Sequence, residues 1–133
     1  MGTKRNLRKI KYKFTEEKDI VIQTALRPAK QCIIQGFVFL DTDGELYIYK
    51  GYSHNGVTLG IDFSFTRIPA LVHDALFQLM QEGLLPLSFF KLCNLELKKL
   101  MIANGSPKFI AKFYYFMVQT FGKPFAKRKL NFS

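Results

Sequence analysis

The sequence predicts an α+β protein: a small antiparallel β-sheet in the N-terminal half, packed with three C-terminal α-helices. Two observations predict this class. Short β-branched and aromatic runs separated by turn residues fill residues 14–52, and from residue 66 the apolar spacing changes from about two to about 3.6 residues. All the predicted strands precede all the predicted helices, which favours α+β over an alternating α/β order.

The β half contains one well-marked hairpin. Residues 20–24 form a short predicted strand, and residues 32–40 form a longer one in which Gly36 marks a bulge or a close backbone approach. The residues Asp41-Thr42-Asp43-Gly44 then supply turn chemistry, and residues 46–49 form the return strand. Because the spacing of these acidic residues is not that of an EF-hand, a hairpin turn is favoured over a calcium loop.

Capping, proline and glycine residues set the bounds of the helices. The three predicted helices cover residues 66–82, 89–104 and 107–121. Thr66 and Ser88 are the expected N-caps of the first two, because their hydroxyls can accept a hydrogen bond from a free backbone N–H. Gly83, Gly105 and Gly122 stand where each helix should stop.

The third predicted helix is rich in aromatic residues on several of its sides. It contains Phe109, Phe113, Tyr114, Tyr115, Phe116 and Phe121. Apolar side chains all round a helix are typical of burial on more than one side, so we expect this helix to fill the core. The alternative is that one aromatic face docks on another subunit or protein.

The 133 residues predict one domain, residues 14–122, between a basic N-terminal arm (1–13) and a basic C-terminal tail (123–133). Half of the 20 Lys and Arg residues lie in these two ends: Lys4, Arg5, Arg8, Lys9, Lys11, Lys13, Lys123, Lys127, Arg128 and Lys129. Like charges at this density repel, so both ends should be extended and available to DNA or an acidic protein surface. Two cysteines are too few for a disulfide scaffold, and no run is long enough for a membrane span.

Polar residues interrupt the apolar stripes of the first two predicted helices. His73 and Asp74 lie on or beside the first stripe, and Asn94 lies inside the second. If the helices pack through these stripes, His73 or Asp74 meets Asn94 in a partly buried place, where each polar group needs a partner. Two interpretations follow: a polar clamp that fixes how the helices dock, or a catalytic or metal site.

In the catalytic interpretation, His73 is the base, Asp74 orients it, and Asn94 or Asn55 binds an oxyanion. One His with one Asp falls short of the three or four ligands of a zinc site, so no metal or other cofactor is predicted. Cys93 lies on an apolar helix face and is expected in the core rather than as a nucleophile.

Residues 51–58, followed by Ala-Leu-Val-His-Asp-Ala-Leu-Phe-Gln-Leu-Met at 70–80 and an aromatic helix ending in Phe-Gly at 113–122, resemble a family of small phage and prophage proteins. This family is the domain of unknown function 1353. The resemblance extends over roughly residues 36–122 and implies a compact α+β unit encoded by bacteriophages. Where the family pattern has Trp-Asp, a second Asp and a Tyr, this chain has His54-Asn55, Asn94 and Phe77. Because Asn carries no charge and takes no proton near neutral pH, these differences disfavour catalysis.

The expected function is therefore that of a non-catalytic phage protein, a virion or assembly component. It would dock on other phage structural proteins, or on DNA, through its basic termini. The alternative is a hydrolase that acts on a host envelope polymer or lipid through His73 and Asp74. No secretory signal follows the basic start, so the expected location is the virion or the host cytoplasm. The sequence does not predict an oligomeric state.

Overall fold

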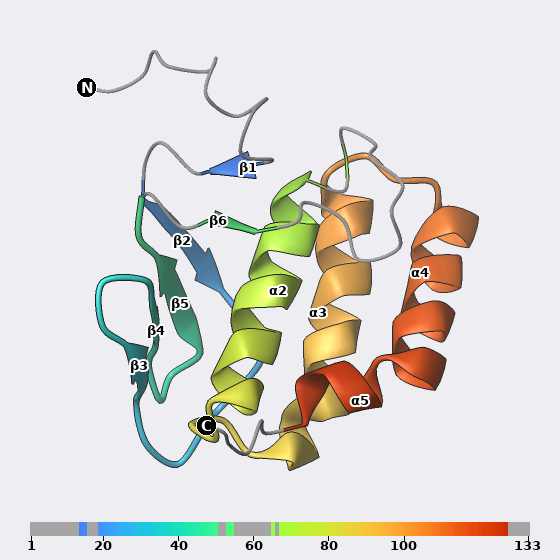
Figure 1. The fold of residues 1–133 in the computed structure, drawn as a ribbon. Helices are drawn as coiled ribbons and strands as arrows, with labels where there is room; N and C mark the ends of the chain where they lie inside the picture. The colour runs from blue at the N-terminus through green and yellow to red at the C-terminus, as the bar shows by residue number, and fades with distance from the viewer. Residues whose placement is uncertain (1–13, 16–18, 51–52, 55–64, 66, 128–133) are drawn as a thin grey trace.

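The computed structural model describes residues 14–15, 19–50, 53–54, 65 and 67–127. Strands come first and helices follow, so the predicted α+β class is confirmed (Figure 1). The elements are β1 (Phe14–Thr15), β2 (Ile20–Gln23), β3 (Cys32–Ile34), β4 (Val38–Leu40), β5 (Glu45–Ile48), β6 (Ser53–His54), α2 (Arg67–Gln81), the 3-10 turn η2 (Leu87–Phe89), α3 (Phe90–Ala103), α4 (Lys108–Phe121) and α5 (Lys123–Ala126).

Four strands form an antiparallel sheet in the order β2-β5-β4-β3. The predicted hairpin is confirmed, since β4 and β5 pair across the turn at 41–44, where the Gly44 N–H donates to the Asp41 carbonyl at 3.0 Å. The single long strand predicted for residues 32–40 is wrong. Gly36, with a φ of 82°, instead forms a turn between β3 and β4. A side chain there would meet nothing within 4 Å, so positive φ and not close packing is the reason for this glycine.

The three predicted helices are found within a few residues of their expected bounds, but one expected cap is wrong. Ser88 lies inside η2, and Phe89 precedes α3 without a side-chain capping bond. Thr66 lies outside the described residues. Gly83 and Gly105 have positive φ and end their helices as expected.

The beginning of the basic tail is helical, not extended as predicted. After Gly122 the chain forms α5, whose Ala126 is fully buried. The Gln81 side-chain amide at the end of α2 donates to the carbonyl of Phe125. The apolar anchor and the hydrogen bond fix this short helix, which contains one lysine, so residues 123–126 belong to the folded unit.

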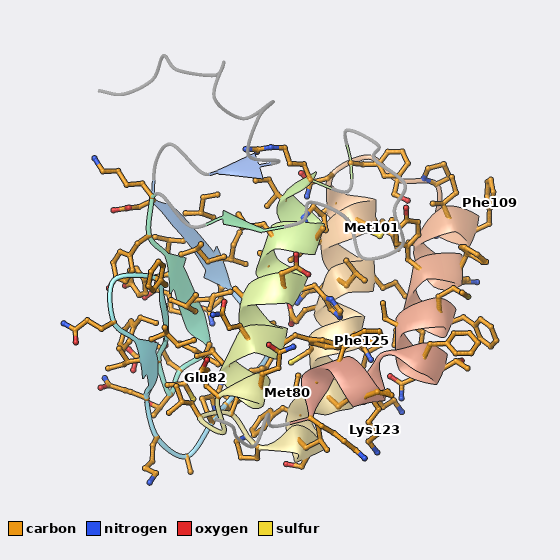
Figure 2. The ribbon with its side chains drawn as sticks, in the orientation of Figure 1. Met80, Glu82, Met101, Phe109, Lys123 and Phe125 are labelled. Carbon is orange, nitrogen blue, oxygen red and sulfur yellow. The ribbon has the colours of Figure 1, made fainter. Side chains whose placement is uncertain are left out.

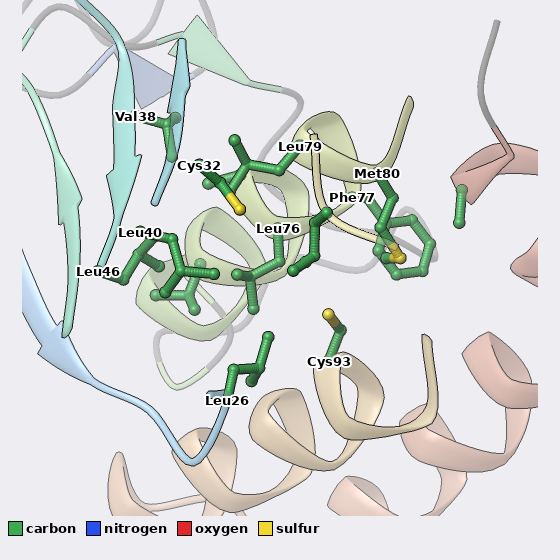
Figure 3. Packing of buried hydrophobic residues seen from close by; sticks show 14 of the residues in the cluster. Leu26, Cys32, Val38, Leu40, Leu46, Leu76, Phe77, Leu79, Met80 and Cys93 are labelled. Atoms are coloured by element: carbon green, nitrogen blue, oxygen red, sulfur yellow. The ribbon is translucent and has the colours of Figure 1, made fainter. Parts of the chain in front are cut away.

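The elements lie in layers: the sheet, then α2, then α3, then α4 (Figure 1). A first hydrophobic core joins the sheet to α2 and reaches α3 at Phe90 and Cys93; Figure 3 shows side chains from both sides converging on Leu76. A second, smaller core joins α3 to α4 and consists of Leu97, Met101, Ala111, Tyr114 and Val118.

The expectation that α4 fills the core is wrong for most of its aromatic residues. Phe109, Phe113 and Phe116 are 73%, 50% and 59% exposed, and Phe121 is also exposed. Only Tyr114 of this group is buried, because α4 packs on α3 along a single side. Within the described residues, none of the helices has the length and apolar character needed to cross a membrane.

Candidate functional site

His73 and Asn94 meet between α2 and α3, as the sequence predicted. Their side chains are 1% and 0% exposed, and His73 Nε2 lies 2.7 Å from Asn94 Oδ1. The two helices pack through the stripes that contain these residues, so each polar group is removed from water and supplies the other's partner.

Gln119 of α4 extends this contact to a third helix. Asn94 Nδ2 donates to Gln119 Oε1 at 2.8 Å, which leaves Asn94 Oδ1 to accept. His73 Nε2 is then the donor, and the proton of the neutral ring is on that nitrogen. Sequence reasoning missed Gln119. The sequence pattern that could have identified Gln119 is the one that singled out Asn94. It is a polar residue beside an apolar stripe, here next to Val118.

The His73 imidazole lies in an apolar environment. The ring of Phe77 is 4.1 Å away between centroids, and Nδ1 has no hydrogen-bond partner in the described part of the chain. Burial lowers the pKa of His73; the hydrogen bond to Asn94 and the negative charge of Asp74 act against this without reversing it. The ring is therefore neutral near pH 7, and its accepting nitrogen faces protein atoms.

The other predicted site residues have separate outcomes. Asp74 follows it on α2 but is partly exposed, and Asn55 lies outside the described residues. Of the ten basic residues predicted to bind partners, Lys123 and Lys127 are exposed at the two ends of α5, and the other eight lie outside the described residues. The structure thus brings together His73 and Asn94, and it adds Gln119.

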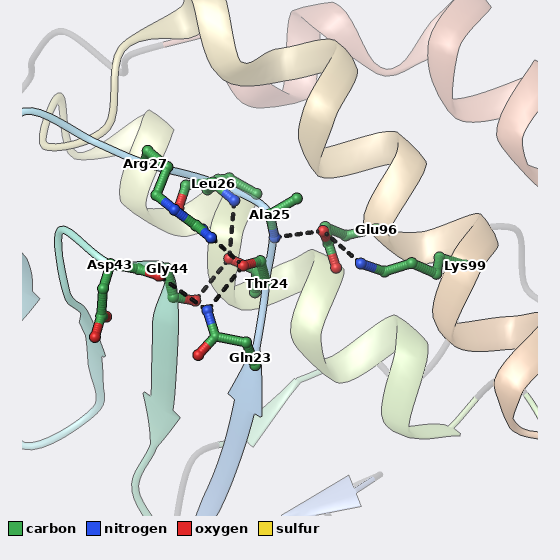
Figure 4. A network of polar contacts seen from close by, with 9 residues as sticks. All are labelled: Gln23, Thr24, Ala25, Leu26, Arg27, Asp43, Gly44, Glu96 and Lys99. Carbon is green, nitrogen blue, oxygen red and sulfur yellow. Dashed lines mark hydrogen bonds and ion pairs between the residues drawn. The ribbon is translucent and has the colours of Figure 1, made fainter.

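A second buried polar residue, Glu96, joins α3 to the chain that follows β2 (Figure 4). Its side chain is 3% exposed, and Oε2 accepts from the Ala25 N–H at 2.7 Å and from Lys99 Nζ at 3.2 Å. In the described residues, Oε1 has no partner. Glu96 was also missed, although it lies directly before Leu97 of the apolar stripe of α3.

The two thiols and the acidic turn residues have structural roles. Cys32 and Cys93 are buried, and burial raises the pKa of both thiols, so neither is poised as a thiolate. Asp41 and Asp43 accept backbone N–H groups of their own turn, from Thr42 at 2.8 Å and Glu45 at 3.1 Å. In the described ranges, no three His, Cys, Asp or Glu residues are grouped so that they could hold a metal ion.

The arrangement around His73 is a chain of three neutral side chains from three helices, in which His73 and Asn94 are buried and Gln119 is partly exposed. Chemically it can fix the relative position of α2, α3 and α4, because breaking any link leaves a buried polar group unpaired. Comparison of the chain with protein-family models, with curated proteins and with solved structures finds no match.

Proposed function

We propose that this chain is a non-catalytic docking protein of a bacteriophage, a virion or assembly component. One observation carries the non-catalytic part: the imidazole of His73 is 1% exposed, and its donor nitrogen is committed to Asn94. A general base must lie within hydrogen-bond reach of the proton that it removes from a substrate. A ring enclosed by Phe77 and Asn94 is suited to holding helices together.

Charge supports a docking function. After Glu96 the sequence contains no Asp or Glu, and it contains Lys98, Lys99, Lys108, Lys112, Lys123, Lys127, Arg128 and Lys129. A region of the chain with this excess of positive charge attracts partners of the opposite sign and speeds their encounter. The proposed partners are acidic faces of other phage structural proteins; DNA is the alternative partner for the basic termini.

The catalytic alternative is tested with His73→Ala and a matched His54→Ala control. We expect no hydrolysis of bacterial envelope polymer or phospholipid by the unsubstituted protein, and a lower free energy of unfolding for His73→Ala. Hydrolysis that disappears in a folded His73→Ala protein, and persists in His54→Ala, would overturn the non-catalytic assignment.

Docking is tested in lysates that contain phage particles. We expect the full chain to sediment with particles in a density gradient, and a chain with Lys123→Glu and Lys127→Glu to do so less. A chain that stays at the top of the gradient contradicts docking on particles. A gel shift with DNA that falls steeply with salt and disappears when residues 1–13 are deleted would instead assign the basic arm to nucleic acid.

A further inference from the structure

In the part of the chain that the structure describes, one face of the four-stranded sheet is left open, and a row of apolar side chains crosses it. Val21, Tyr47, Phe39 and Ile33 are direct cross-strand neighbours and form one row across all four strands. Val21 and Ile33, at the two edges, are each 49% exposed. Phe37 and Tyr49, also exposed, extend this open sheet face beyond the row.

Among the described residues, the outer side of α4 is a second apolar surface that is left open. Phe109, Phe113 and Phe116 follow the spacing i, i+4, i+7, which places them on one side of the helix, and Lys112 lies among them. Phe109 points away from α3 in Figure 2. We call Phe109, Lys112, Phe113 and Phe116 the aromatic helix face.

These two surfaces lie on opposite sides of the molecule, with α2 and α3 between them (Figure 1). The inner side of the sheet contacts α2, and the inner side of α4 contacts α3. One surface is an open sheet and the other is a helix. A helix packed on the free side of a sheet is a usual way for both to bury apolar area.

One end of the open sheet face and the surroundings of the aromatic helix face carry opposite charges. Asp41, Asp43 and Glu45 lie at one end of the open sheet face, next to the apolar row. The described residues 105–127, which include the aromatic helix face, contain no acidic residue, and their lysines at 108, 112, 123 and 127 are all exposed. An acidic end on the sheet face and basic surroundings on the helix face favour contact between the two surfaces over pairing of either with itself.

The dimensions also agree. The three Phe residues extend over about 10 Å of helix at 1.5 Å per residue. The apolar row crosses three strand spacings, or about 14 Å. The helix stripe therefore fits on the row.

We propose that the aromatic helix face of one copy of this chain docks on the open sheet face of a second copy, head to tail. The inference rests on the proposed docking function and names a partner for it, a further copy of the same chain. Because the two surfaces are different and lie on opposite sides, the contact does not close in a two-fold dimer; it continues into an open row or a ring. Each internal copy would then have helices on both sides of its sheet.

Sedimentation velocity over a range of concentrations tests the proposal. We expect the full chain to form species larger than a dimer. Phe113→Glu on the helix face and Ile33→Lys on the sheet face should each weaken self-association at least tenfold, since central aromatic and aliphatic anchors dominate such contacts. Leu92→Glu, a matched change of an exposed apolar residue outside both surfaces, should leave it unchanged. All three changes are at exposed positions, and circular dichroism checks that each variant is folded.

Mixing the two face variants gives the decisive result. Phe113→Glu retains an intact sheet face and Ile33→Lys retains an intact helix face, so a head-to-tail contact predicts a one-to-one complex that grows no further. If either variant still dimerises by itself, one surface must pair with the same surface of a second copy, and the proposal is wrong. The proposal is equally wrong if the full chain is monomeric at concentrations up to about 1 mM. The same holds if the monomeric chain binds vesicles of anionic lipid.

The particle sedimentation described above separates this proposal from the proposed function. A monomeric chain that still sediments with particles overturns only the contact between copies. A chain that self-associates but never sediments with particles contradicts docking on other phage proteins and leaves the head-to-tail contact standing.

Discussion

Helices α2 and α4 have nearly equal lengths and similarly apolar sequences, yet they are buried to very different degrees. Ten of the 15 residues of α2 are buried, and only three of the 14 residues of α4. The sheet covers one side of α2 and α3 covers the other, whereas among the described elements α4 has α3 alone as its layer neighbour. The position of a helix in the stack, more than its composition, decides how much of it is enclosed.

The largest expected effect comes from a substitution in the first core, which joins the sheet to α2. Leu76 on α2 is fully buried between sheet and helices, so Leu76→Ala should lower the free energy of unfolding by about 2–5 kcal/mol, through lost burial and a residual cavity. Urea denaturation measures it. Val118→Ala, in the smaller core beside α4, is the comparison and should cost less, because fewer methyl groups are removed and a nearby surface can relax. A larger loss at Val118 would contradict the ranking of the two cores.

The second-largest expected effect comes from breaking the polar contacts that Asn94 of α3 makes with α2 and α4. Asn94→Ala removes the partner of both His73 and Gln119, and leaving buried polar groups unpaired costs about 1–3 kcal/mol. Gln119→Ala should cost less, since Gln119 is partly exposed and Asn94 keeps its bond to His73. A double-mutant cycle of Asn94 with His73 should give a coupling energy above about 0.5 kcal/mol. Additive losses would show that the chain does not act as a unit.

A pH dependence follows from the buried imidazole on α2. Burial holds the pKa of His73 in the folded protein below its ordinary value of 6.5, so below pH 6.5 the unfolded chain binds the proton more readily. The contribution of His73 to the free energy of unfolding is then fully present above pH 6.5. It falls as the pH drops toward the folded-state pKa, by at most about 1.4 kcal/mol per pH unit. Urea unfolding at several pH values measures the slope. His73→Leu should remove this contribution, and an unchanged slope in that variant would assign it to other groups.

The smallest expected effect concerns the outer side of α4. Phe116 is more than half exposed, so Phe116→Ala should change the free energy of unfolding of the isolated monomer by no more than about 0.5 kcal/mol. The same change should still weaken self-association, which separates a docking residue from a core residue. A loss of several kcal/mol in dilute monomer would mean that this side of α4 is enclosed after all.

Features that depend on near neighbours along the chain could be predicted from the amino-acid sequence. The glycines at 83 and 105 ended their helices, the Asp41–Gly44 turn paired β4 with β5, and the interrupted stripes predicted that His73 meets Asn94. Each of these rests on backbone geometry or on the 3.6-residue period, which are local properties.

Other features depend on how elements distant in the sequence pack together, and these came only from the tertiary structure. It made Gln119 the third member of the polar chain and left the phenylalanines of α4 exposed. An aromatic residue has the same apolar character in a core and at a surface. Its burial depends on how many other elements surround it, and that number is fixed only when the sheet, α2, α3 and α4 have stacked in order.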